Sequence, residues 1–257
     1  MQFSKKDIED LNQSHMLVKK KYQSLLLTFA HRQYQQKEAQ EYAIHGFLRR
    51  LKILKRCIDN VYSICPPDID QNLSEEKISD LTINLQAFVF NLYGSLDNLA
   101  WVWVKEKGIL NEKGERLSKS KIGFSKKDKY KAVRNTFSPE FQAYLKTLDE
   151  WFDDIENFRH ALAHRIPLYV PPYIFMGEAI TQQAKDLENR AMEALNNQQL
   201  YEHTHLMNEI EMLGKFVPLM THSFSEDSKH VVFHAQIIAD WNTVVQISEN
   251  FIKELDC

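Results

Sequence analysis

Residues 81–104 read LTINLQAFVFNLYGSLDNLAWVWV, the most apolar stretch of the 257-residue chain. Leucine and aromatic side chains recur along it at three- and four-residue spacing, which predicts an α-helix with a wide apolar face. The stretch contains too many polar side chains for a membrane span, namely Asn84, Gln86, Asn91, Asp97 and Asn98. We therefore predict a buried helix inside an all-α core.

The flanking residues place the ends of this helix. Ser74 is followed by two glutamates, a pattern typical of a helix N-cap with acidic residues at the positive end of the helix dipole, so the helix is predicted from Ser74 to about Lys107. Gly94 lies inside it. A glycine there lowers helix propensity by about 1 kcal/mol and suggests close contact with another helix.

The first 64 residues contain one glycine and no proline, which predicts a long N-terminal helix. From Ile44 to Cys65 the apolar residues again follow helical spacing, and this amphipathic helix should end at Pro66-Pro67, because proline cannot donate the next backbone hydrogen bond.

Three more helical segments are predicted after residue 137. Ser138-Pro139-Glu140 begins a long helix that should run to about Arg165. Residues 178–216 have a polar helical pattern with a break at Asn196-Asn197, typical of a hairpin or arm. A last core helix should run from near His230 to Leu255.

These elements predict a single domain, residues 1–257, in the form of an all-α helical bundle. Its core should comprise about residues 41–166 and 228–256, with a helical arm inserted at about 177–217. The chain has only 7 Gly and 7 Pro residues, which favours long helices over the many tight turns of a sandwich or barrel.

Cys57, Cys65 and Cys257 form neither a C-x-x-C pair nor an even disulfide framework, so we interpret them as thiols in a reducing compartment. The first ten residues are charged where a secretory peptide would be apolar. The sequence therefore predicts a cytoplasmic protein, away from the membrane, and no motif points to a cofactor.

The net charge of −3 is unevenly distributed. Between Lys105 and Lys131, ten Lys or Arg residues face four acidic residues, and this segment is the best candidate for contact with phosphate. The residues chosen as RNA-binding candidates are Lys119, Lys121, Lys126 and Lys127. The alternative is an ordinary solvated surface.

Arg159 falls on the apolar row of the predicted helix after Pro139, one turn beyond Ile155. Arginine is rarely buried without a partner, so this position predicts a carboxylate, a second subunit or a bound phosphate beside it. A structural ion pair, for which Asp97 is the suggested partner, is the plainer interpretation.

His164 follows in the last turn, where the negative end of the helix dipole favours an imidazolium. Five residues place it well away from the Arg159 face, so the two side chains should meet only through distortion near Pro167 or across a second subunit. A solvated histidine at a helix end is the alternative.

The string FRHALAHR at residues 158–165, on a helix that follows NLYGSLDNLAW, resembles the HEPN superfamily of helical-bundle proteins. The mark of that superfamily is R-x4-6-H, and Arg159 and His164 match it. His160 occupies the polar position that often follows the arginine. The resemblance covers mainly residues 76–166, whereas the arm and the long N-terminal helix are not part of a minimal HEPN bundle.

The resemblance implies a homodimer in which two Arg-His pairs form one metal-independent ribonuclease site with Arg159, His160 and His164 as catalytic residues. A histidine would accept the proton of a 2′-hydroxyl as it attacks the adjacent phosphate, and the arginine would bind the phosphate oxygens. RNA and an antitoxin-like protein are the implied partners, and no metal or other cofactor is implied.

Two other functions stay open from the sequence. One is a catalytically silent HEPN-like module that binds RNA, a nucleotide or a protein. The other is a metal-dependent hydrolase, because His160 with His164 and His230 with His234 are each four residues apart. None of these four histidines belongs to an H-E-x-x-H or E-x-x-H pattern, and one histidine of the second pair is equally suited to core packing.

Overall fold

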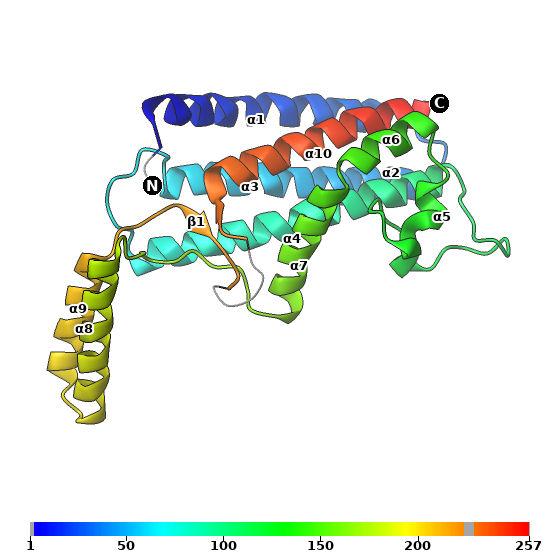
Figure 1. The fold of residues 1–257 in the computed structure, drawn as a ribbon. Coiled ribbons are helices and arrows are strands. Elements are labelled where there is room, and N and C mark those ends of the chain that lie inside the picture. The colour runs from blue at the N-terminus through cyan, green and yellow to red at the C-terminus, as the bar shows by residue number, and fades with distance from the viewer. Residues whose placement is uncertain (1–2, 224–228, 257) are drawn as a thin grey trace.

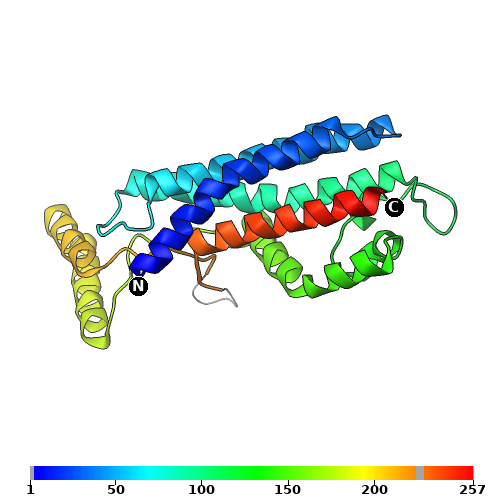
Figure 2. The ribbon, with the colours of Figure 1, turned by 90° about the horizontal axis from the view of Figure 1, so that it is seen from above.

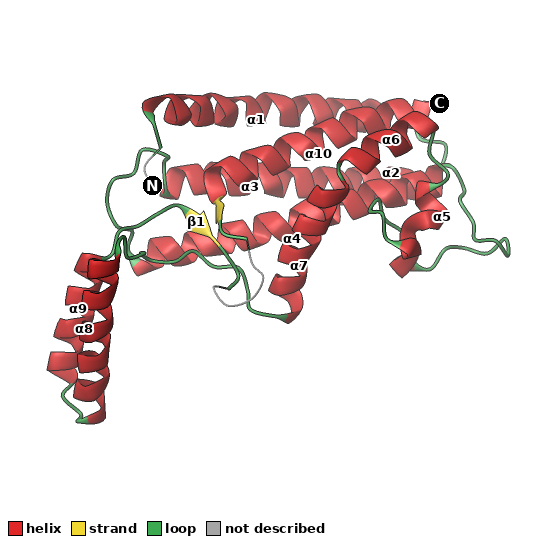
Figure 3. Ribbon diagram, in the orientation of Figure 1, coloured by secondary structure: helices red, strands yellow, loops and turns green. Residues whose placement is uncertain are grey.

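A computed structural model describes residues 3–223 and 229–256 and confirms the all-α bundle with an inserted helical arm (Figure 3). Its helices are α1 (Lys5–His31), α2 (Lys37–Glu41), α3 (Leu48–Ile64), α4 (Glu75–Glu106), α5 (Lys131–Arg134), α6 (Pro139–Thr147), α7 (Asp149–His164), α8 (Glu178–Asn196), α9 (Leu200–Leu213) and α10 (Phe233–Asp256). Strands β1 (Leu219–Met220) and β2 (Val231–Val232) pair antiparallel, with Leu219 opposite Val232. None of the described helices has the length and apolarity needed to cross a membrane.

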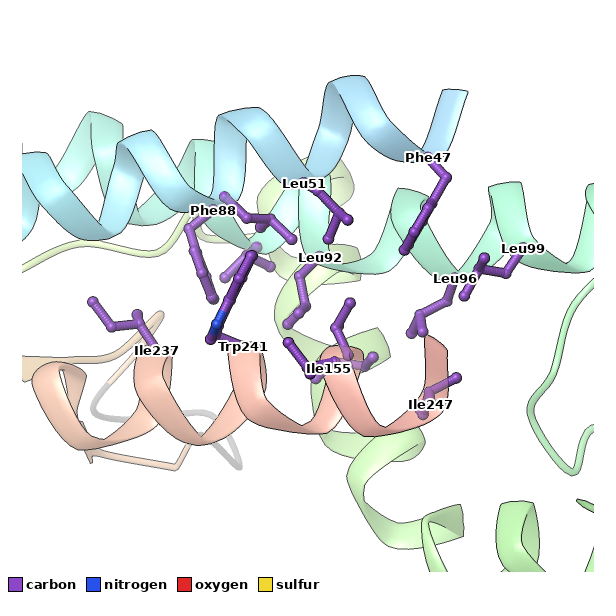
Figure 4. Packing of buried hydrophobic residues seen from close by; sticks show 14 of the residues in the cluster. Phe47, Leu51, Phe88, Leu92, Leu96, Leu99, Ile155, Ile237, Trp241 and Ile247 are labelled. Atoms are coloured by element: carbon purple, nitrogen blue, oxygen red, sulfur yellow. The ribbon is translucent and has the colours of Figure 1, made fainter. Parts of the chain in front are cut away.

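Helix α4, which contains the apolar stretch, lies inside the bundle and contacts α3, α7 and α10 (Figures 1 and 2). Its buried residues form one continuous core with those of the neighbouring helices, and Figure 4 shows Trp241 of α10 between Phe88 and Leu92 of α4. Burial on several sides explains the width of the apolar face. The predicted cap is present, since the Ser74 hydroxyl accepts a hydrogen bond from the Lys77 amide.

The N-terminal helix α1 packs on α3 and α10, and its Val18, Leu25 and Phe29 belong to the main core. The core therefore extends to α1, beyond the residues 41–166 and 228–256 proposed from the sequence. The side chain of Lys21 also donates to the Asn242 side-chain oxygen at 2.7 Å, which joins α1 to α10 on the outside of this contact.

The helix predicted from Ile44 begins earlier, at Lys37, and reaches α3 through a π-helical segment, Tyr42–Phe47. Alternating three- and four-residue spacing cannot distinguish a π-turn from an α-turn, because the extra residue only shifts the apolar row. The predicted end at Pro66-Pro67 is confirmed, since α3 ends at Ile64.

The single helix predicted from Ser138 to about Arg165 is wrong, because the chain forms two helices that meet at Leu148. Leu148 has φ −104° and ψ 5°, and its amide bonds the carbonyl of Leu145, three residues back. The bend allows α6 to follow the end of α10 while α7 crosses α4 (Figure 1). Both halves bury apolar residues in the same core, which is why the sequence pattern runs through the bend.

Helices α8 and α9 form the arm, a hairpin that projects from one end of the bundle in both views (Figures 1 and 2). The predicted break at Asn196-Asn197 is confirmed, and Gln198 in the turn has φ 59°. The arm has its own small core, in which alanines allow close helix contact, formed by Leu187, Ala191, Ala194, Leu206 and Ile210.

Cys57 and Cys65 are buried free thiols, and burial raises the pKa of Cys57 to about 11 and that of Cys65 to about 12. Neither is a reactive thiolate at neutral pH. The third cysteine, Cys257, lies outside the described residues.

Ser138 caps α6 and also anchors it to α10. Its hydroxyl accepts from the Phe141 amide at 3.2 Å and donates to the Glu254 carboxylate at 2.6 Å, and its own amide donates to Glu254 at 2.6 Å. Glu254 is buried, so each hydrogen bond that it loses leaves a desolvated carboxylate oxygen.

We predict that Ser138→Ala lowers the free energy of unfolding by about 2–3 kcal/mol, since it removes the cap and one hydrogen bond to buried Glu254. The matched control is Ser74→Ala. The Ser74 cap is an exposed hydrogen bond of 3.4 Å with no buried partner, so its loss should lower the free energy of unfolding by about 1 kcal/mol or less. Urea unfolding of both variants checks the difference. Equal losses would contradict the anchoring role.

Candidate functional site

Arg159 lies where α7 crosses α4, and its side chain is half-buried. The guanidinium carbon stands 5.3 Å from the ring centroid of Tyr93 on α4, a cation–π arrangement. Across residues 3–223 and 229–256, no carboxylate lies within 4 Å of Arg159 and its guanidinium makes no hydrogen bond. The aliphatic stem thus follows the apolar row, whereas the charged end keeps its donors for water or a ligand.

Asp97 lies one turn after Tyr93 on α4, where burial raises the pKa of its carboxyl to about 6. The nearby positive charges of Arg159, Arg50 and Lys129 act in the opposite direction, and the carboxylate of Glu156 adds to the rise. The ion pair suggested between Arg159 and Asp97 is not present as a contact within 4 Å. The two charged groups interact only through a longer-range electrostatic attraction.

Glu156 is a buried carboxylate on α7, three residues before Arg159. Its Oε1 accepts from the Lys127 ammonium at 2.7 Å and lies 3.5 Å from Nε2 of His160. Its Oε2 is buried and has no hydrogen-bond partner within the described parts of the chain. Buried polar atoms without a partner are uncommon in folded proteins, so we treat Glu156 as a candidate site residue.

Neither Glu156 nor Tyr93 was singled out from the sequence as a site residue. The sequence carried a weak signal for both residues. Glu156 lies one helical turn before His160, and Tyr93 lies one turn before Asp97, so each shares a helix face with a residue that was already a candidate. Which helix faces which could not be derived from that spacing.

His160 and His164 are exposed on the last turns of α7, with ring centroids 5.9 Å apart. The helix is regular through His164, and the first non-helical residue is Arg165. Distortion near Pro167 therefore does not bring His164 toward Arg159, and helical geometry keeps the two about 140° apart around the axis. Within one chain, His160 lies beside Glu156, whereas Arg159 contacts Tyr93.

The four lysines proposed to contact RNA fall into two groups. Lys126 pairs with Asp153 at 2.7 Å and Lys127 with Glu156 at 2.7 Å, so the basic loop does lie against α7, but these two charges are balanced there. Lys119 and Lys121 are exposed in a short 3₁₀-helix and form no ion pair with any described residue.

The two histidine pairs differ in their suitability for metal binding. His230 precedes α10, whereas His234 is buried in its first turn with Nε2 2.6 Å from the carbonyl oxygen of Cys65. The burial of His234 confirms the core-packing interpretation of this histidine, and it lowers the pKa of the imidazole to about 4. Among the described residues, no group of three or more His, Cys, Asp or Glu side chains is arranged to hold a metal ion.

Comparisons with protein-family models, with curated proteins and with solved structures found no match to this chain.

We predict that Asp97→Asn changes how stability depends on pH. Folding raises the pKa of Asp97 from 3.8 to about 6, so the folded state holds the proton more tightly and the free energy of unfolding should fall as pH rises through this window. The variant should lose that contribution, on the order of 2 kcal/mol between pH 4 and 6.

Urea unfolding at several pH values measures this slope. The control is Asp10→Asn, because Asp10 is an exposed residue of α1. This variant removes one carboxylate without changing the residues around Asp97, and it should keep the wild-type slope. A variant at Asp97 with the same slope as the wild type would show that the carboxyl is not held in its neutral form by burial.

Proposed function

We propose that this chain is a HEPN-like, metal-independent endoribonuclease whose composite site forms between two copies. The observation that supports the proposal most strongly is the state of Arg159. Its guanidinium lies over Tyr93 with no carboxylate within 4 Å among the described residues, and the exposed imidazoles of His160 and His164 follow on the same helix end. Such a guanidinium is available to fork onto phosphate.

The proposed reaction uses His164 as the general base. It accepts the 2′-hydroxyl proton, the 2′-oxygen forms a bond to the adjacent phosphorus, and the bond from phosphorus to the 5′-oxygen breaks. The leaving 5′-oxygen takes a proton from water, and His164 releases the proton that it accepted to solvent, which yields a 2′,3′-cyclic phosphate and a free 5′-hydroxyl. Arg159 neutralises the charge that builds on the phosphate oxygens, and His160, the next residue in the chain, shares this role in the proposal.

A second copy is required because Arg159 and His164 diverge around one regular helix. Apolar surface near the site suits self-association. Ile166, two residues after His164, is 45% exposed, and Phe90, between Gln86 and Tyr93 on α4, is 42% exposed. Gln86 bonds the carbonyl of Leu168, so this face of α4 lies beside the segment that follows α7. The proposal of an antitoxin-like partner rests on the HEPN resemblance alone.

The second candidate is a catalytically silent module that binds RNA, a nucleotide or a protein. The observation that favours a nucleotide or protein ligand over RNA is that Lys126 and Lys127 are paired with acidic side chains of α7, which reduces the attraction for an RNA backbone. In that case Arg159 would serve only to pack against Tyr93.

We predict that the wild type cleaves RNA in EDTA and leaves 2′,3′-cyclic phosphate ends, and that His164→Ala lowers the rate about 10²-fold or more, the usual contribution of a general base. The control is His31→Ala, an exposed histidine at the end of α1. Arg159→Ala should lose activity to a similar extent. The double variant should be hardly worse, because the two residues act as one unit.

The same assay separates the candidates. Equal rates for His164→Ala and the wild type would show that the proposed site is wrong. RNA binding without cleavage in any salt or metal would favour the silent module, and activity that appears only with added divalent metal would favour a metal-dependent hydrolase.

We also predict a dimer at tens of micromolar protein, roughly the range in which weak specific contacts form. Ile166→Asp places a charge beside His164 and should give a monomer in sedimentation. Met16→Asp, at an exposed position of α1, should stay dimeric. A monomeric wild type, or equal behaviour of the two variants, would contradict a composite site at this face.

A further inference from the structure

A groove of about 660 Å³ lies between α4 and the helical path from α2 through the π-helical segment into α3. Its basic and amide side chains are His45, Arg49, Arg50, Asn91, Asn98 and Lys105. It contains neither Arg159 nor His164, so it is separate from the site proposed above.

Arg50 is half-buried in this groove and is held by neutral partners. Its Nε donates to Oδ1 of Asn98 at 3.0 Å, and its Nη1 donates to Oδ1 of Asn91 at 3.2 Å. Asn91 is itself oriented by donating to the carbonyl of Ala87. Throughout the described chain, no carboxylate lies within 4 Å of Arg50, so the guanidinium is positioned without being neutralised by direct contact.

Two glycines make room for the groove's side chains. A Cβ at Gly94 would lie 2.5 Å from the guanidinium carbon of Arg50, and a Cβ at Gly46 would lie 2.8 Å from Cγ of Asn98. Gly46 belongs to the π-helical segment, a conformation that is rare and found frequently at functional sites. The backbone is thus shaped around Arg50 and Asn98.

The charged side chains that line the groove leave an excess of one positive charge, because two arginines are accompanied by one carboxylate that is unpaired among the described residues, Glu41. Lys105 is paired with Glu38 at 2.9 Å, and Glu41 is exposed. Arg49 contacts only Nδ1 of His45, at 3.0 Å, among the polar groups of the described residues. Arg49 and Arg50 therefore line one groove with no carboxylate in contact with either, an arrangement that suits a phosphate group with several acceptor oxygens.

We propose that this groove binds the phosphate monoester of a small ligand, such as a mononucleotide, through Arg50 and Arg49, with Asn98 and Asn91 positioning Arg50. The site does not depend on the proposed ribonuclease activity. Tyr42 lines the same groove, and its ring is stacked on Trp101 with centroids 4.9 Å apart, which supplies a rigid apolar wall beside the phosphate position.

Calorimetric titration of the full chain in phosphate-free buffer tests the proposal, with inorganic phosphate, 5′-AMP and adenosine as probes. Phosphate and 5′-AMP should bind and adenosine should not. Arg50→Gln should weaken 5′-AMP binding at least about tenfold, as expected when a charge-assisted hydrogen bond is lost. Arg56→Gln, the same change at an exposed position of α3 outside the groove, should bind like the wild type.

Gly94→Ala provides a second test that alters no charge. Alanine favours the helix, and the three heavy atoms nearest to its methyl group all belong to the flexible end of Arg50, so the variant should fold while displacing that guanidinium. It should bind 5′-AMP as weakly as Arg50→Gln does. No binding to the wild type, equal binding of adenosine, or equal effects of Arg50→Gln and Arg56→Gln would overturn the proposal.

Discussion

Helix α4 is enclosed by α3, α7 and α10, and the positions of its polar side chains depend on that enclosure. A polar group buried without a partner costs several kcal/mol, so the polar residues of α4 are confined to the places where neighbouring helices leave a gap or offer a partner. Each of the two proposed sites lies at one such place. Tyr93 and Asp97 face α7, and Asn91 and Asn98 face the start of α3.

The two places are electrostatically connected through Asp97. Its carboxyl is close enough to Arg159 on one side and Arg50 on the other for both charges to lower its pKa, yet burial outweighs them and the pKa rises to about 6. Near neutral pH this one carboxylate attracts both arginines without contacting either within 4 Å. Both guanidiniums therefore keep hydrogen-bond donors available for phosphate, the ligand type to which Arg is best suited.

Much of the fold could be predicted because it depends on local chemistry. The Ser74 and Ser138 caps, the end of α3 before Pro66 and the turn of the arm each follow from the conformational preferences of a few adjacent residues. The bend at Leu148 and the π-helical turn at Tyr42–Phe47 were missed for a shared reason. Both preserve the apolar row in sequence, and only packing against α4 and α10 distinguishes them from a continuous α-helix.

For the sites, the sequence by itself determined that Arg159 lies on an apolar row with His164 five residues later, since a helix places residues by number alone. It could not decide what stands opposite. Tertiary structure decided that Arg159 contacts the Tyr93 ring rather than a carboxylate and that Lys127 pairs with Glu156. It also decided that the guanidinium of Arg50 packs against Gly94. These contacts join residues 29 to 66 positions apart, and their geometry follows from the angles at which whole helices pack, which no local pattern encodes.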